Sequence, residues 1–229
     1  MAYKITRICP KPRDTLKLLE ANPVVLRLKT EPITLDQTKI CKIMITLAQP
    51  SLVLNTYGVK THFQYSSFWR SWSLPQNATS KDVVNCIATA CDHSPELALR
   101  HVVLHAHAED AVIYVGQDAT INILNVGDFQ PLASRDIGCI WLHACSPAQT
   151  NYGARFCLQL AANSGTTVVA AADEQYDPSS LATLFMPAGT IDDFEGRVYQ
   201  FSADGLNYWL INPNGGKFAG PPTVYSTQG

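Results

Sequence analysis

Two residues with the chemistry of a cysteine hydrolase lie at the ends of two apolar runs. His107 closes the run from His101 to His107, and Cys145 follows the run from Ile137 to Ala144. The thiolate is the nucleophilic form of cysteine, and a neighbouring imidazole lowers the thiol pKa and can protonate a leaving amine. If the two runs are parallel, neighbouring strands, both side chains emerge at the same edge of a sheet. The pattern therefore predicts a Cys–His dyad at that edge.

The same histidines also allow a metal site as an alternative. His105 and His107 are two residues apart and would share one face of a strand, as in the H-x-H-x-D-H signature of metallo-β-lactamase-type hydrolases. His143 and Cys145 repeat this spacing, which gives four nitrogen and sulfur ligands suited to zinc. However, Glu109 and Asp110 stand where that signature has Asp-His, and no histidine follows His143. The dyad is the preferred interpretation.

A third interpretation assigns no chemistry to these residues. Cysteine is among the most frequently buried residue types, and strand histidines are often hydrogen-bonded core residues. Cys139, Cys157, His101 and His143 are best assigned to the core in this way. If Cys145 is equally inert, the chain is a binding or scaffold module.

The elements that would position the dyad follow from local patterns. Thr79 or Ser80 can cap a helix that carries Val83, Val84, Ile87 and Cys91 on one face. Segments 111–115 and 120–124 flank Gly116 and predict a hairpin. Residues 150–163 predict a second helix that ends near Gly165, and 166–172 predict a third buried strand. The order strand, helix, strand favours a parallel sheet with right-handed crossovers.

The two ends of the chain give weaker signals. Segments 24–28 and 42–47 are short β-prone runs, and an aromatic stretch from Tyr57 to Trp72 most often covers the edge of a core. Segments 197–201 and 208–211 predict a terminal hairpin, and the Gly/Pro-rich tail from Gly215 is expected to be flexible.

Composition excludes several classes of function. The 229 residues suit one domain, with 46% hydrophobic residues, 16% charged residues and a formal net charge of −2. No basic block indicates a nucleic-acid groove, and no run approaches the roughly 20 apolar residues of a membrane span. We expect a cytoplasmic protein, or one delivered outside the cell without a conventional signal peptide. Seven cysteines without a C-x-x-C pair favour reduced thiols over a disulfide framework.

The segment around Cys145 resembles a known family. Ile140-Trp-Leu-His-Ala-Cys145-Ser-Pro-Ala148 is followed by Gly153, Phe156, Leu160-Ala161, Gly165 and the strand Val168–Ala171. This series resembles the nucleophile segment of the caspase–gingipain clan of cysteine peptidases (clan CD). The most similar pattern is the caspase-like domain of large bacterial surface proteins. The resemblance covers residues 80–175 and is most specific from 137 to 172.

This resemblance implies an α/β fold: a caspase-like α/β/α sandwich with a mostly parallel central sheet and a C-terminal β-hairpin. It also implies a thiol protease that uses His107 and Cys145, needs no cofactor and acts on a protein or peptide. The family normally has glycine after its histidine, whereas this chain has Ala108. That departure leaves His105 as an alternative base, and it bears on the oxyanion-hole donors expected near Cys145 and after His107.

The resemblance also suggests a substrate pocket and a division of the chain. In clan relatives, the segment after the third strand lines the pocket for the residue before the scissile bond. Asp173 and Glu174 lie there, and their charges would favour Lys or Arg. We expect a single domain over 1–229, with a divergent part at 1–78, a core at 79–176, a loop and hairpin at 177–214 and a tail at 215–229.

Overall fold

The central sheet places five parallel strands beside three antiparallel ones. The computed structural model describes residues 5–6, 44–59, 68–175, 186–211 and 224–226. The strands lie in the order β16 (Val224–Ser226), β15 (Asn207–Ile211), β14 (Val198–Phe201), β12 (Thr167–Ala171), β11 (Cys139–His143), β6 (His101–His105), β3 (Ser51–Asn55) and β4 (Arg70–Ser73). All pairings from β12 to β4 are parallel, and those from β12 to β16 are antiparallel. The expected α/β fold with a mostly parallel sheet is confirmed.

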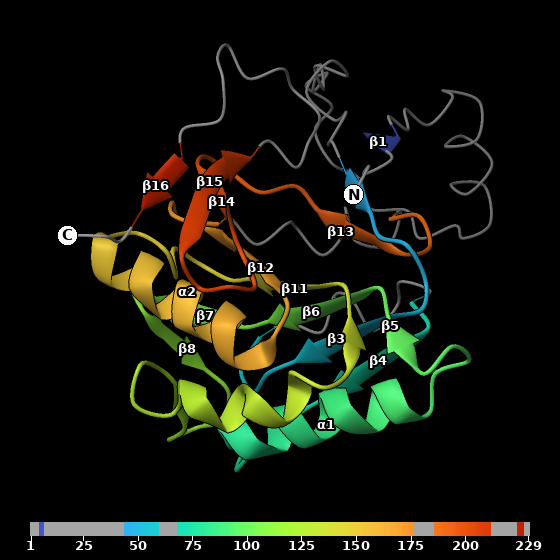
Figure 1. The fold of residues 1–229 in the computed structure, drawn as a ribbon. Coiled ribbons are helices and arrows are strands. Elements are labelled where there is room, and N and C mark those ends of the chain that lie inside the picture. Colours follow the sequence, from blue (N-terminus) through green and yellow to red (C-terminus); the bar gives the residue numbers. More distant parts are fainter. Residues whose placement is uncertain (1–4, 7–43, 60–67, 176–185, 212–223, 227–229) are drawn as a thin grey trace, which may run out of the picture.

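The helices of the described chain cover one face of this sheet. These are α1 (Ser80–Asp92), α2 (Asn151–Ser164) and the 3-10 helix η3 (Val126–Leu132), and Figure 1 shows α1 and α2 packed along the sheet. Ile87, Phe129 and Phe156 are fully buried against alternate strand residues such as Leu104 and Leu142. This face holds the larger of the two hydrophobic cores.

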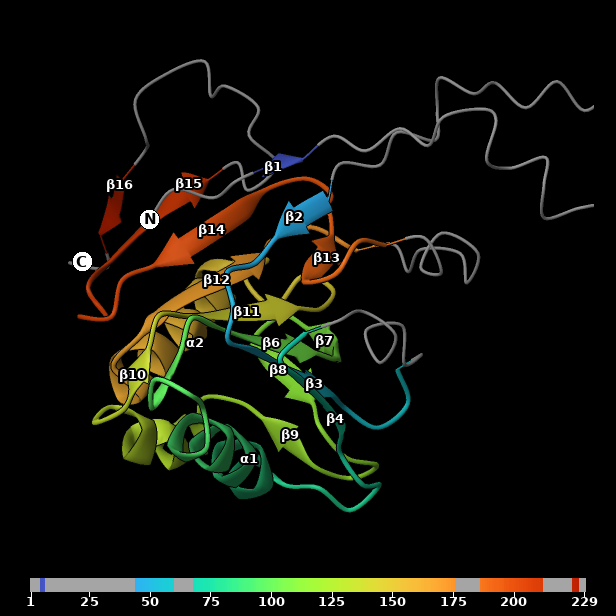
Figure 2. The same cartoon turned by 90° about the vertical axis from the view of Figure 1, so that its right-hand side faces the viewer.

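The opposite face is covered differently from the expected three-layer sandwich. Within the described ranges, β1 (Ile5–Thr6), β2 (Met44–Thr46) and β13 (Thr190–Asp192) form a small antiparallel sheet there instead of a helical layer. Figure 2 shows this small sheet and the helices on opposite sides of the central sheet. Ile45, Ile191 and Phe194 pack on Trp141 and its neighbours to form the second core.

Both long helices begin and end where their caps predict. Thr79 caps α1 through a reciprocal capping box with Asp82, which also holds the pKa of the Asp82 carboxyl below its usual value. Thr150 caps α2, because its hydroxyl accepts a hydrogen bond from the Tyr152 N–H. Gly165 ends α2 in the left-handed conformation, with φ of 64°.

The run 101–107 is not a single strand. Strand β6 ends at His105, and His107 opens β7 (His107–Glu109), which pairs with β8 (Val112–Tyr114) and then β9 (Thr120–Ile121). The short strands β5 (Ala98–Leu99) and β10 (Asp136–Ile137) pair with each other. The predicted hairpin around Gly116 is confirmed as β8–β9. The run is apolar through Ala106, so the sequence carries no signal that the strand is interrupted there. The prediction therefore joined β6 and β7 into one strand.

Other expectations have mixed outcomes. The terminal hairpin is confirmed as β14–β15, but part of the tail pairs as β16 with the edge of β15, so residues 224–226 are not a loose segment. Trp69 and Trp72 pack on the edge of the larger core as expected. Strands β3 and β4, although within 1–78, belong to the central sheet. The run 24–28, Phe63 and Tyr65 lie outside the described residues.

Candidate active site

Cys145 and the candidate histidines lie at the same edge of the central sheet. Strands β6 and β11 are parallel neighbours, with Leu142 opposite Leu104 and His143 opposite His105. Cys145 follows β11 by two residues, and His107 follows the end of β6 by the same number. The expected placement beyond the carboxyl ends of two adjacent strands is therefore confirmed.

His107 is exposed and is oriented by a backbone carbonyl. Its Nε2 lies 3.3 Å from the carbonyl oxygen of Gly58, in the loop that follows β3. A carbonyl only accepts hydrogen bonds, so this contact requires the proton on Nε2 and leaves the lone pair of the neutral ring on Nδ1. Gly58 has φ of 89°, a conformation that favours glycine. The ring is thus held in a tautomer that suits a general base.

His105 is buried and is oriented by an amide. Its Nδ1 lies 3.0 Å from Oδ1 of Asn55, while Nδ2 of Asn55 donates to the carbonyl oxygen of Trp72 at 3.4 Å. The carbonyl oxygen of Trp72 can only accept a hydrogen bond, so it must face the amide nitrogen of Asn55. The amide oxygen of Asn55 then faces His105, and Nδ1 of His105 is the donor. The His105 and His143 ring centroids are 5.5 Å apart, and His143 stacks obliquely on Phe194. His105 therefore belongs to the second core face.

Cys145 is half-buried, and its thiol already has a partner. Its Sγ donates to the carbonyl oxygen of Gln175 at 3.4 Å. The following residue, Ser146, has φ of 43°, which is uncommon for a residue with a side chain. The Ser146 N–H donates to the Asp173 carbonyl oxygen at 3.2 Å, and the Ala148 N–H donates to that of Ala171 at 3.0 Å. These bonds fix the loop after Cys145 against β12 and its extension.

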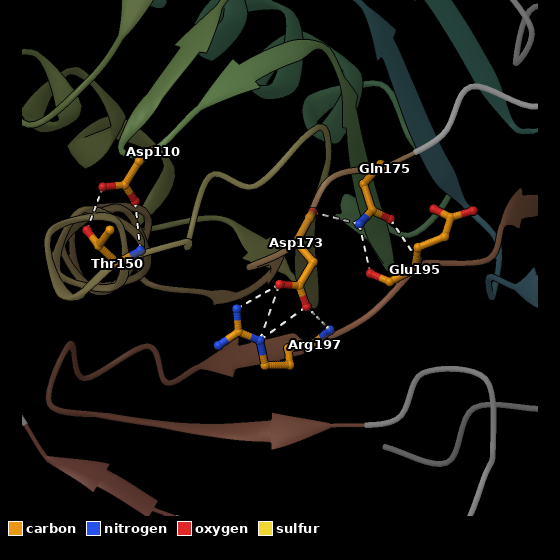
Figure 3. Close-up of polar contacts among 6 residues, drawn as sticks. All are labelled: Asp110, Thr150, Asp173, Gln175, Glu195 and Arg197. Atoms are coloured by element: carbon orange, nitrogen blue, oxygen red, sulfur yellow. Dashed lines mark hydrogen bonds and ion pairs between the residues drawn. The ribbon is translucent and has the colours of Figure 1, made fainter.

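The two acidic residues expected to line a pocket differ in their surroundings. Arg197 pairs with Asp173 through its guanidinium at 2.7 Å and donates its backbone N–H to Oδ2 at 2.6 Å (Figure 3). These bonds hold the pKa of the Asp173 carboxyl below its usual value and raise the pKa of Arg197. Glu174, in contrast, is exposed. The charge of Asp173 is therefore balanced within the chain, and Glu174 carries the acidic character of this segment.

Two polar contacts at this edge were not found from the sequence. Gln175 Nε2 donates to the carbonyl oxygens of Asp173 and Glu195, and Gln175 Oε1 accepts from the Glu195 N–H at 3.0 Å (Figure 3). Asp110, between β7 and β8, accepts from the N–H and the hydroxyl of Thr150. The capping position of Thr150 was readable from its type, but its partner comes from a hairpin 40 residues earlier.

The two cysteines and two histidines predicted for the core, Cys139, Cys157, His101 and His143, are buried as expected. Cys139 and Cys157 are fully buried, and burial raises the pKa of both thiols. Trp141 Nε1 donates to Nδ1 of His101 at 3.1 Å, and burial lowers the pKa of His101 to about 4. Within the described ranges, no three His, Cys, Asp or Glu residues are arranged to hold a metal ion. That includes the alternative set His105, His107, His143 and Cys145.

Comparison of the chain with family models, curated proteins and solved structures finds no match in any of the three. Among the described residues, none of the helices has both the length and the apolar character that a membrane crossing requires.

Proposed function

We propose that this protein is a caspase-like cysteine endopeptidase in which Cys145 is the nucleophile and His107 the acid–base residue. The observation that carries the proposal is the contact between His107 Nε2 and the Gly58 carbonyl oxygen, at the sheet edge where Cys145 emerges. It leaves a basic ring nitrogen on an exposed side chain at the same sheet edge as the half-buried Cys145 thiol. This combination suits nucleophilic catalysis better than a core role.

The reaction would proceed through a thioester. His107 takes the thiol proton, and Cys145 Sγ attacks the carbonyl carbon of the scissile peptide bond. The tetrahedral intermediate collapses, the carbon–nitrogen bond breaks, and the imidazolium gives its proton to the leaving amine. His107 then activates a water molecule, which hydrolyses the thioester to a carboxylate and the free thiol. Because the Ser146 N–H is engaged by Asp173, the Cys145 N–H is the proposed oxyanion donor.

Ala108 does not prevent this arrangement. Among the described residues, positive φ angles without glycine occur at Leu97, Ala111 and Ser146, and Ala108 is not one of them. Ala108 pairs with Ile113 in the β7–β8 ladder and its side chain is buried. An alanine therefore fits the position that follows the proposed base. The substrate preference for Lys or Arg is assigned to Glu174, since Arg197 balances Asp173.

His105 is the second candidate for the base, favoured by its hydrogen bond to Asn55. Asn55 would orient the ring as the third member of a Cys–His–Asn arrangement does. The two histidines are distinguished by replacing each one with alanine in the same assay.

The test is the reactivity of Cys145 toward limiting iodoacetamide between pH 5 and 9, with the labelled cysteines mapped by mass spectrometry. Cys86 is the internal control, because it is also half-buried but lies on α1, where burial and Asp82 raise its thiol pKa. We expect Cys145 to react at least about tenfold faster than Cys86 at pH 7, because an imidazole that takes the thiol proton increases the thiolate fraction. His107→Ala should remove most of that advantage, and Cys145→Ala should abolish peptide hydrolysis.

Three results would contradict the proposal in different ways. Equal reactivity of Cys145 and Cys86 would favour the binding-module alternative. Loss of the advantage in His105→Ala alone would transfer the role of the base to His105. Protection of Cys145 that a chelator relieves would favour a metal site.

A further inference from the structure

Asp110 connects the hairpin that carries His107 to the segment that carries Cys145. It lies in the turn between β7 and β8, three residues after His107. Its Oδ1 accepts the Thr150 N–H at 3.0 Å, and its Oδ2 accepts the Thr150 hydroxyl at 2.5 Å. Figure 3 shows the carboxylate facing both groups of Thr150 at the start of α2. One side chain therefore binds the N-cap residue of the helix that follows Cys145.

The backbone of the hairpin turn lies close to the backbone of the loop before α2. The Ala111 N–H donates to the Pro147 carbonyl oxygen at 3.1 Å, and Ala111 has φ of 62°. A Cβ atom at Gly153 would lie 2.2 Å from Asp110 Oδ1 and 2.6 Å from the Pro147 oxygen. Only glycine avoids that clash in the first turn of α2. The hairpin turn, the loop after Cys145 and α2 thus meet at one point.

The loop between Cys145 and α2 is held from two sides. Hydrogen bonds from Ser146 and Ala148 fix it to the end of β12, and Asp110 and Ala111 fix it to the hairpin. The bonds to β12 do not involve the hairpin. The bonds of Asp110 and Ala111 therefore act together with the β6–β11 pairing in fixing the His107 hairpin relative to the Cys145 loop.

We infer that Asp110, through Thr150, is a positioning residue that sets the geometry between His107 and Cys145. This inference rests on the proposed function. Loss of the carboxylate removes both bonds to Thr150 and leaves the Ala111–Pro147 backbone bond to hold the hairpin turn to the loop, so this connection loosens. The interaction between the imidazole and the thiol then weakens, because it falls off with small changes in distance and angle.

The test measures how strongly His107 controls the reactivity of Cys145. The ratio of the Cys145 alkylation rates with and without His107→Ala is determined in the full chain at pH 7. We expect a ratio on the order of ten in the parent chain, and a ratio close to one in Asp110→Ala. Asp110→Asn keeps an acceptor for the Thr150 N–H and should retain most of the ratio, as should Thr150→Ser, whereas Thr150→Val should lower it.

Asp82→Ala is the matched control, because Asp82 with Thr79 caps α1 in a similar way. It should lower the unfolding temperature without changing the ratio. If Asp110→Ala also lowers only the unfolding temperature, Asp110 is purely structural and the inference is overturned. If Asp110→Ala does not fold, the ratio is compared between Thr150→Val and Thr150→Ser. A lower ratio in Thr150→Val supports the inference, and equal ratios overturn it. A ratio of one in the parent chain overturns the proposed function, and the inference with it.

Discussion

The hydrogen-bond partners of three histidines, at the edge of the central sheet and in the core, determine which ring nitrogen carries the proton. Acceptor-only partners fix the proton on Nε2 of His107 and on Nδ1 of His105, whereas Trp141 donates to Nδ1 of His101. A protonated His101 would place two donors against each other in a buried site. His101 is therefore held neutral, unlike a base that must accept and release a proton during turnover.

The protonation of His101 predicts how stability depends on pH. Its pKa is about 4 in the folded chain and about 6.5 in the unfolded chain, so the unfolded chain binds the additional proton between these values. The free energy of unfolding should therefore decrease as the pH falls from about 6.5 to about 4, by up to roughly 3 kcal/mol. Urea unfolding at a series of pH values measures this.

His101→Gln should flatten that slope, because Gln can accept from Trp141 without titrating. His93→Gln, at an exposed histidine, is the control and should keep the slope. An unchanged slope in His101→Gln would assign the pH dependence to other groups.

At the scale of elements, helix ends make the largest local demands on residue type. Gly165 ends α2 with a positive φ, and a Cβ atom there would lie 2.9 Å from the Ala133 Cα. Gly165→Ala should destabilise the fold by about 1–3 kcal/mol, combining backbone strain with the clash. Gly127→Ala is the matched control, because a Cβ atom at Gly127 has no neighbour within 4 Å. Thermal unfolding of both variants checks the prediction, and equal stabilities would contradict it.

The elements also show what a sequence can and cannot reveal. Strands β6, β11 and β12 were predictable because they are buried on both faces and hence largely apolar. The first helix was predictable from its cap at Thr79, and the second from its apolar spacing and Gly165. Strand β3 was missed, since Ser51 and Asn55 are polar and only three apolar residues lie between them. Yet β3 supplies Asn55 and leads to Gly58, the partners of the two candidate bases.

Within the site, the positions of Cys145 and His107 at one sheet edge followed from the order of the strands. The partners of the surrounding side chains did not. Asp173 with Arg197 and Gln175 with Glu195 are brought together by the antiparallel return of β14 beside β12. No local pattern encodes that return. The sequence therefore predicted that Asp173 and Glu174 would both be available to a substrate, whereas Arg197 pairs with Asp173.

At the scale of the whole molecule, the two hydrophobic cores share one sheet. Cys157 lies in the core beneath the helices, and Cys139 in the core beneath the small sheet. Both thiols are inaccessible in the folded chain. They therefore report independently on the opening of the two faces.

We expect the two faces to unfold together, as the single domain predicted for 1–229 requires. Pulse alkylation across a urea gradient should label Cys139 and Cys157 with the same midpoint. Labelling of Cys139 at lower urea would instead identify the small sheet and its core as a separately opening unit. Cys86, half-buried in the folded chain, serves as the control for alkylation that does not require global unfolding.

The antiparallel return of β14 has a consequence for the order of synthesis. The ribosome releases the chain from the N-terminus, so Cys145 and its histidines emerge before Glu195 and Arg197 exist. Until those two residues appear, segment 173–175, which contacts the Cys145 thiol, lacks its bonds to Glu195 and Arg197. A nascent chain would thus carry the proposed nucleophile before the bonds that hold segment 173–175 beside it have formed. The proposed peptide cleavage would then become possible only late in translation, after Glu195 and Arg197 have emerged.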